Sequence, residues 1–166
     1  MSKKVVLAFS GGLDTSFCVP YLKEQGYEVH TVMVNTGGFS AEEEKAIEER
    51  AMKLGAASHK NVNAVNTYYE KGIRYLIYGN ILKNATYPLS VSSERVFQAL
   101  EVLKQVKAIG ADAVAHGSTG AGNDQVRFDI VFEILAPSVE IIAPVREHGF
   151  TRQYEIDFLQ QHGFDF

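Results

Sequence analysis

Short apolar runs alternate with longer amphipathic stretches along the whole chain. The apolar runs predict buried strands at residues 5–8, 29–34, 113–116 and 141–143, and residues 57–62 are expected to form a further, more polar strand. Helices are expected over 15–25, 41–54, 66–78, 92–109, 123–136 and 151–162, since glycine follows most of these stretches and Pro137 stops the fifth. This alternation predicts an α/β, Rossmann-like three-layer fold: a mostly parallel sheet with helices on both faces.

The composition is that of one ordinary globular domain. The chain has 166 residues, 46% hydrophobic and 22% charged, so residues 1–166 are expected to form a single domain. Its one cysteine, Cys18, allows neither an internal disulfide nor a zinc cluster and suits a reducing compartment, so a cytoplasmic location is expected. The apolar run at 5–9 is too short for a signal peptide, and no membrane span is indicated. The net charge of −4 argues against nonspecific nucleic-acid binding.

The first chemical signal is the string Ser-Gly-Gly-Leu-Asp-Thr-Ser at residues 10–16, between an expected strand and an expected helix. Glycines let backbone amides approach an anion, and the helix start adds free N–H groups and a positive dipole end. Asp14 suits a magnesium ligand or a capping group, and no other metal motif is present. The string lacks the Gly-Lys-Ser/Thr ending of an ordinary P-loop and resembles the pyrophosphate loop of enzymes that split ATP between the α and β phosphates. The alternative is a helix start capped by these side chains, without a ligand.

The second signal is the segment 116–129, which reads His-Gly-Ser-Thr-Gly-Ala-Gly-Asn-Asp-Gln-Val-Arg-Phe-Asp. Its glycines make a pliable turn, and Asn123 and Arg127 share one face of the helix that follows. A guanidinium can clamp a carboxylate with two hydrogen bonds, and a carboxylate such as Asp124 suits an ammonium group. The segment therefore indicates an amino-acid site. The alternative is a structural turn, with Asn123 as the N-cap and Arg127 paired with Asp124 or Glu133.

Together and in this order, the two strings strongly resemble the argininosuccinate synthase family, over residues 5–163. The resemblance implies ATP with magnesium as the cofactor, and ATP contacts from Ala8, Phe9, Ser10, Gly11, Gly12, Leu13, Asp14, Thr15, Ser16, Val34 and Gly117. It implies citrulline contacts from Tyr87, Ser92, Asn123 and Arg127, and aspartate contacts from Thr119, Asn123 and Asp124. Two places depart from the family: residues 89–96 read Leu-Ser-Val-Ser-Ser-Glu-Arg-Val, which affects the loop before Ser92, and Val34 replaces a frequent alanine.

The resemblance implies a carbon–nitrogen ligase of arginine biosynthesis. In that family, citrulline attacks the α-phosphorus of ATP to give citrullyl-adenylate and pyrophosphate, and the amine of aspartate then displaces AMP. No residue is singled out as a catalytic base. The family's enzymes are longer homotetramers whose second domain completes the citrulline site, so this chain is expected to be the ATP-binding part and to turn over poorly alone. The alternatives are another pyrophosphate-loop adenylating enzyme, tRNA-thiolating or amidating, and a nucleotide-binding fragment without turnover.

Several further residues are given structural roles. Cys18 is expected to pack in the core, and His116 to orient the adjoining loop. The tyrosines at 68, 69, 75 and 78 fall at helical spacing and are expected to be packing residues. Glu94 is expected in the first turn of its helix, where it would favour the helix dipole.

Overall fold

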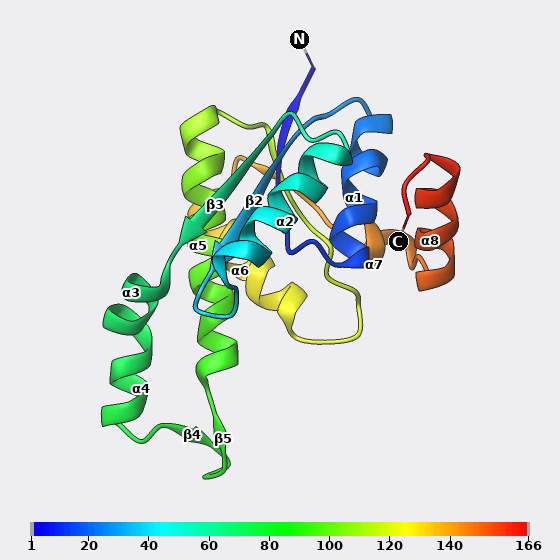
Figure 1. Ribbon diagram of the computed structural model, residues 1–166. Coiled ribbons are helices and arrows are strands. Elements are labelled where there is room, and N and C mark those ends of the chain that lie inside the picture. Colours follow the sequence, from blue (N-terminus) through cyan, green and yellow to red (C-terminus); the bar gives the residue numbers. More distant parts are fainter. Residues whose placement is uncertain (1, 166) are drawn as a thin grey trace.

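The computed structural model describes residues 2–165, which are built around a five-stranded parallel sheet (Figure 1). Its strands are β1 (Lys4–Ala8), β2 (Glu28–Asn35), β3 (Ser58–Asn63), β6 (Ala113–His116) and β7 (Glu140–Ile142), in the order β3-β2-β1-β6-β7. In the central register Val5 lies opposite Val29 on one side and Ala113 on the other. All five expected strands are confirmed, including the polar β3, which lies at an edge of the sheet.

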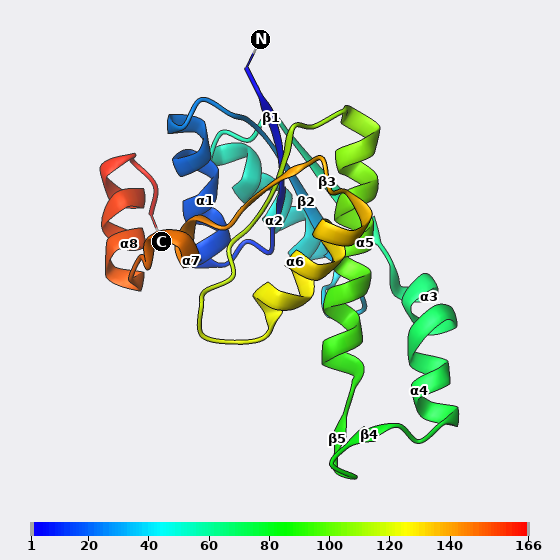
Figure 2. The same ribbon diagram turned by 180° about the vertical axis from the view of Figure 1, so that it is seen from behind.

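Helices cover both faces of the sheet, which confirms the expected three layers. One face is covered by α1 (Leu13–Glu24), α2 (Ala41–Lys53), α7 (Pro144–His148) and α8 (Arg152–Gln161). The other is covered by α5 (Ser90–Ile109) and α6 (Asp124–Leu135), which come to the front in Figure 2. The short α7 is missing from the sequence prediction, although Pro144 in its first turn marks a favourable helix start.

Strand β1 is the centre of the core and is buried on both faces. Val5 and Leu7 point into the cluster that contains Phe17 of α1, whereas Val6 points into the one that contains Phe132 of α6. All five side chains have no exposed surface. This two-sided burial explains why the strand appears in the sequence as an unbroken apolar run.

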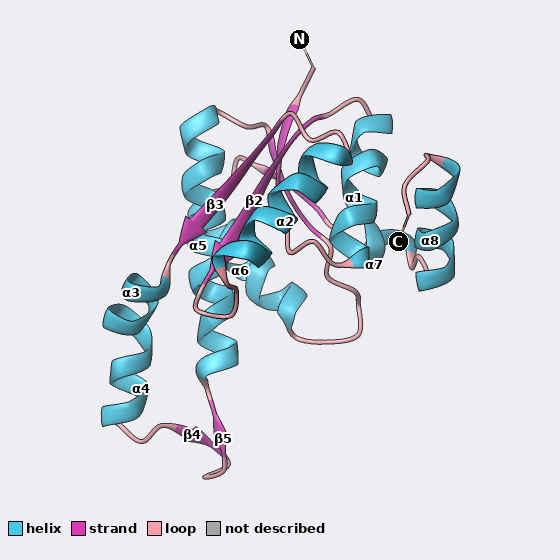
Figure 3. Cartoon of the chain, viewed as in Figure 1, coloured by secondary structure: helices cyan, strands magenta, loops and turns pink. Residues whose placement is uncertain are grey.

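A projecting arm (residues 65–88) extends beyond the sheet (Figures 1 and 3). It contains α3 (Val65–Tyr68), the π-helix η1 (Tyr69–Ile73), α4 (Arg74–Tyr78) and a hairpin of β4 (Leu82–Lys83) and β5 (Tyr87–Pro88). The prediction of one regular helix over 66–78 is therefore wrong. The π-helix contains Gly72, which lies so close to Phe97 that a Cβ there would be 2.9 Å from the ring.

The arm also changes the interpretation of its tyrosines. Tyr68 is buried, and its hydroxyl donates to the carbonyl oxygen of Ser90 at 2.6 Å. Tyr69, Tyr75 and Tyr78 are 47%, 57% and 79% exposed, so the prediction that they are packing residues is wrong. Helical spacing alone cannot reveal that the segment stands away from the sheet.

Two helices begin with a side-chain cap, and one helix begins earlier than predicted. The side chains of Ser40 and Thr151 cap α2 and α8. Helix α5 begins at Ser90, so Glu94 lies beyond the first turn and its expected dipole role is wrong; it accepts a hydrogen bond from the Thr36 hydroxyl instead. Among residues 2–165, no helix is long and apolar enough to cross a lipid bilayer.

Candidate active site

A cleft of about 960 Å³ opens beyond the carboxyl ends of β1, β2 and β6. This is where open parallel sheets bind ligands, and the volume is at the upper end of the range for small-molecule sites. The predicted residues that line the cleft are Ala8, Phe9, Ser10, Gly12, Leu13, Asp14, Thr15, Val34, Gly117, Thr119, Asn123 and Asp124. The fold thus brings the first loop (residues 10–16) and the glycine loop (residues 117–122) to one cavity.

The first loop presents the uncapped start of α1 to the cleft. Gly12 is the N-cap residue, and no side chain within residues 2–165 makes a capping hydrogen bond there. The hydroxyls of Ser10 and Thr15 lie 3.3 Å apart beside it. Because the first N–H groups of a helix have no partner inside the helix, those of α1 are available to an anion in the cleft.

Two predicted residues of the first loop lie behind it. Ser16 is fully buried, and its hydroxyl donates to the carbonyl oxygen of Gly11 at 3.4 Å. Gly11 has a φ of +74°, and a Cβ there would lie 3.1 Å from Ile47 of α2. Both residues therefore pack on the side of the loop that faces away from the cleft, and neither lines the cleft.

Asp14 forms an acid pair with Glu155 of α8. Glu155 is 1% exposed, and its Oε2 has no hydrogen-bond partner within residues 2–165. Burial, together with the charge and hydrogen bond of Asp14, raises the pKa of Glu155 to about 7. The pair attaches α8 to the start of α1. Cys18 lies deeper in α1, where burial raises the pKa of its thiol, so its predicted packing role is confirmed.

His116 holds the glycine loop in place. The N–H of Ser118 donates to its Nδ1 at 3.2 Å, so Nε2 carries the proton and donates to Asp129 at 3.0 Å. Asp129 is also bound by Arg146. Burial is the main cause that lowers the pKa of His116, which favours the neutral ring that this arrangement requires. These contacts support the expected role of His116 in orienting the loop.

The glycine loop also contacts the first loop directly. A Cβ on Gly117 would lie 3.1 Å from the backbone of both Asp14 and Thr15. A side chain at this position would therefore push the two loops apart, which explains why the position is occupied by glycine. The pair of loops forms one continuous wall of the cleft.

A polar cluster of Ser92, Arg95, Asp124 and Arg127 lies at the start of α6. Arg127 donates to Asp124 at 2.6 Å and to the Ser92 hydroxyl at 3.0 Å, and Arg95 donates to Asp124 at 3.1 Å. Partial burial acts to raise the pKa of Asp124, but hydrogen bonds and charge from the two arginines outweigh it and lower the pKa. The alternative pairing of Arg127 with Asp124 is thus present. Asp124 lines the cleft, whereas Arg127 and Ser92 do not. Asn123 is the N-cap residue of α6 but makes no side-chain capping bond.

The sequence prediction missed two arginines at the cleft and placed one tyrosine that lies outside it. Arg95 and Arg152 both line the cleft. The spacing of Ser92 and Arg95, three residues apart on one helix, is the signal that could have identified Arg95. Tyr87 lies on the hairpin of the arm, 54% exposed and outside the cleft.

The sequence has relatives among known proteins. Residues 4–165 match the family model described as the Arginosuccinate synthase N-terminal HUP domain. Proteins named argininosuccinate synthase from Xanthomonas campestris pathovar campestris and Pyrobaculum aerophilum are 47% and 45% identical over 98% of this chain. The chain spans only 42% and 41% of their own lengths.

Solved structures at low identity share the fold. A 4-thiouridine synthetase, solved as an RNA complex with bound ATP, superposes with a TM-score of 0.73 at 18% identity, over 97% of this chain and 41% of that one. A predicted tRNA methyltransferase subunit from Methanocaldococcus jannaschii has a TM-score of 0.60 at 20% identity, over 98% of this chain and 89% of that one. Because the family model covers nearly the whole sequence and the relatives agree with it, the chain belongs to the argininosuccinate synthase family, as its N-terminal HUP domain.

Proposed function

We propose that this chain binds ATP with its triphosphate against the first loop. The observation that carries the proposal is the start of α1, which has no side-chain cap and opens into a nucleotide-sized cleft. Backbone amides and a helix dipole at such a position favour a phosphate. Ala8 and Val34, which line the cleft, are proposed neighbours of the base.

Magnesium would arrive with the nucleotide. Within residues 2–165 there is no group of three or more His, Cys, Asp or Glu side chains that could hold a metal. Mg²⁺ commonly binds through one or two carboxylates together with substrate phosphates, and Asp14 offers one such carboxylate at the cleft. The donor set thus fits a metal held jointly by the protein and the triphosphate, which would neutralise charge on the phosphates.

We further propose the reaction of the family: ligation of citrulline and aspartate to argininosuccinate, in a cytoplasmic homotetramer of the full-length protein. The ureido oxygen of citrulline attacks the α-phosphorus as the bond to pyrophosphate breaks, and the amine of aspartate then displaces AMP. Thr119, Asn123 and Asp124 are proposed to hold aspartate. Ser92, Asn123 and Arg127 are proposed to hold citrulline, together with Tyr87. Because Tyr87 lies outside the cleft, its role requires the hairpin to approach it.

The proposed contributions of these residues are positional. Holding two amino acids and a nucleotide in line can lower a barrier by about 7–11 kcal/mol. Arg127 presents two N–H groups, now bound to Asp124 and Ser92, and a carboxylate ligand could replace either partner. Asp124, held ionised by two arginines, is suited to accept hydrogen bonds from an ammonium group.

Nucleotide binding is tested at Gly12. A Cβ there would meet only the Ser10 hydroxyl, at an ordinary 3.5 Å, so the fold should tolerate substitution. Gly12→Ala and Gly12→Val should weaken ATP binding progressively, measured by calorimetry, because the side chain occupies the space that a phosphate needs. Circular dichroism checks the fold. Unchanged affinity in the folded valine variant would refute the phosphate assignment.

A nucleotide-binding role without turnover is the second candidate, because the chain spans only about two fifths of its relatives. Release of pyrophosphate from ATP, citrulline and aspartate should be measured with this chain and with a full-length relative. We expect the chain to bind ATP and to turn over far more slowly than the relative. Comparable turnover would show that residues 1–166 suffice for the reaction.

A further inference from the structure

The cleft contains more acids than free cations. The first loop has no lysine or arginine. The charged side chains that line the cleft are Asp14, Glu94, Asp124, Arg95 and Arg152. Arg95 is already engaged by Asp124, at 3.1 Å. A bound triphosphate would therefore meet three carboxylates and a single guanidinium that is not hydrogen-bonded to a carboxylate.

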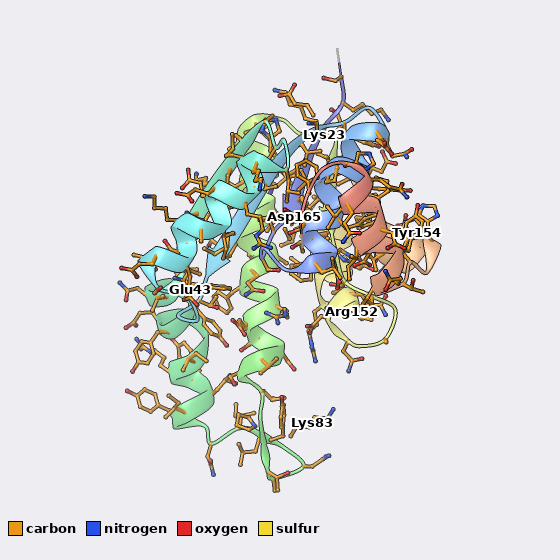
Figure 4. All side chains as sticks on the ribbon, turned by 45° about the vertical axis from the view of Figure 1, so that its right-hand side comes forward. Lys23, Glu43, Lys83, Arg152, Tyr154 and Asp165 are labelled. Carbon is orange, nitrogen blue, oxygen red and sulfur yellow. The ribbon has the colours of Figure 1, made fainter. Side chains whose placement is uncertain are left out.

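That guanidinium belongs to Arg152, the first residue of α8. Within residues 2–165 it makes no hydrogen bond and no close ion pair; its charge acts on the carboxyl of Glu155, where it partly offsets the rise in pKa. Figure 4 shows Arg152 at the beginning of α8, close to the N-terminal end of α1. An arginine that lines a cavity and has no carboxylate bound to it directly is a group that a bound anion can satisfy.

Helix α8 fixes the position of this arginine. Thr151 caps the helix, accepting from the N–H of Tyr154 at 3.2 Å, and Leu159 is fully buried in the core. Glu155, one turn after Arg152 and on the same face, is buried against Asp14 at the start of α1. The backbone of Arg152 is thus held beside the first loop by a packed helix.

The order of the elements indicates which phosphates would reach it. Helix α8 lies on the opposite side of α1 from β2 (Figures 1 and 2). Strand β2 contributes the apolar side chains of Val32, Met33 and Val34 to the lining of the cleft, and these suit a base. A triphosphate that runs from there across the first loop directs its last phosphates toward α8.

We propose that Arg152 binds the β- and γ-phosphates of the nucleotide, and hence the pyrophosphate group when it leaves; this rests on the ATP binding proposed above. A guanidinium offers parallel donors that match phosphate oxygens. It supplies from α8 the positive charge that the first loop lacks. When the bond to the α-phosphorus breaks, negative charge develops on the pyrophosphate, and a positioned guanidinium stabilises it.

The test compares ligands with and without terminal phosphates. Arg152→Gln should weaken binding of Mg-ATP and of pyrophosphate by about tenfold or more, the scale of a charge-assisted hydrogen bond. Binding of AMP should be unchanged, because AMP has only the α-phosphate. Arg74→Gln makes the same substitution on the projecting arm and should leave all three affinities unchanged. Calorimetry on the chain of residues 1–166 measures each, with melting temperature as the check on folding.

The outcomes separate this inference from the proposed function. If wild-type protein binds neither ATP nor pyrophosphate, ATP binding itself is refuted, and the role of Arg152 with it. If the wild type binds ATP and Arg152→Gln binds it equally well, only the role of Arg152 is overturned. Parallel weakening of ATP and AMP overturns it too, since that result indicates a general effect on the cleft. Partial recovery of pyrophosphate binding in Arg152→Lys would support it.

Discussion

Replacing Glu155 with glutamine is expected to stabilise the protein at neutral pH and to leave its stability nearly unchanged in acid. The folded protein holds the proton of Glu155 up to about pH 7, whereas the unfolded chain releases it near 4.5. Between these values, the folded state binds more protons than the unfolded state, so rising pH favours unfolding. Glutamine has the shape of the protonated acid and does not titrate. The variant therefore avoids the loss of stability that the wild type shows as the pH rises.

The size of the expected stabilisation follows from the pKa of Glu155. An increase from 4.5 to about 7 corresponds to roughly 3 kcal/mol, at about 1.4 kcal/mol for each pH unit. Asp14 lines the open cleft, and water on that side screens the pair, so we expect a gain of about 1–3 kcal/mol above pH 7. At about pH 3.5, one unit below the pKa of the unfolded chain, the two proteins should be almost equally stable, because the wild-type side chain is then mostly protonated in both states.

Urea unfolding at several pH values measures the effect. The chain has no tryptophan and 8 tyrosines, so circular dichroism and tyrosine fluorescence are suitable probes. Glu133→Gln makes the same chemical change on the exposed surface of α6 and serves as the control. A stability difference that does not grow between about pH 5 and pH 7 would refute the protonated, buried state assigned to Glu155.

Two further substitutions test the loop contacts and the polar cluster. Gly117→Ala should lower the free energy of unfolding by about 1–3 kcal/mol and weaken ATP binding, because its Cβ would lie 3.1 Å from the backbone of the first loop. Gly120→Ala, whose Cβ would be 3.9 Å from its nearest neighbour, should have little effect in the same denaturation and calorimetry experiments. Arg127→Lys keeps the charge but loses the two-donor fork, so in a full-length relative it should weaken use of citrulline by about 1–3 kcal/mol with little effect on ATP binding. Equal losses for ATP and citrulline would indicate that Arg127 only holds its helix in place.

The parts of the fold that were predictable are those in which local sequence and tertiary burial agree. Strand β1 is buried on both faces, so its apolar run is unambiguous. Residues 66–78 have helical spacing but are divided by a π-helix and project from the sheet, so most of their tyrosines remain exposed. Nothing in the local sequence reports whether a helix has a partner to pack against.

The same distinction applies to the candidate site. The residues of the first loop are neighbours in the chain, and their chemistry is recognisable as a string. Arg152 and Glu155 belong to the last helix, more than a hundred residues from the first loop, and only tertiary packing brings them to it. Their polar character in the sequence is equally consistent with an exposed helix surface.

The missing side-chain cap on α1 has a consequence for how the protein depends on its surroundings. A ligand that satisfies the free N–H groups at the start of α1 binds only the folded state, because the unfolded chain has no such site. Its binding then adds to stability in proportion to the logarithm of its concentration, by about 2.7 kcal/mol at a hundred times the dissociation constant. The nucleotide would in this way complete the N-terminal cap of α1. At low nucleotide concentration the protein would therefore unfold more often and be more accessible to proteases.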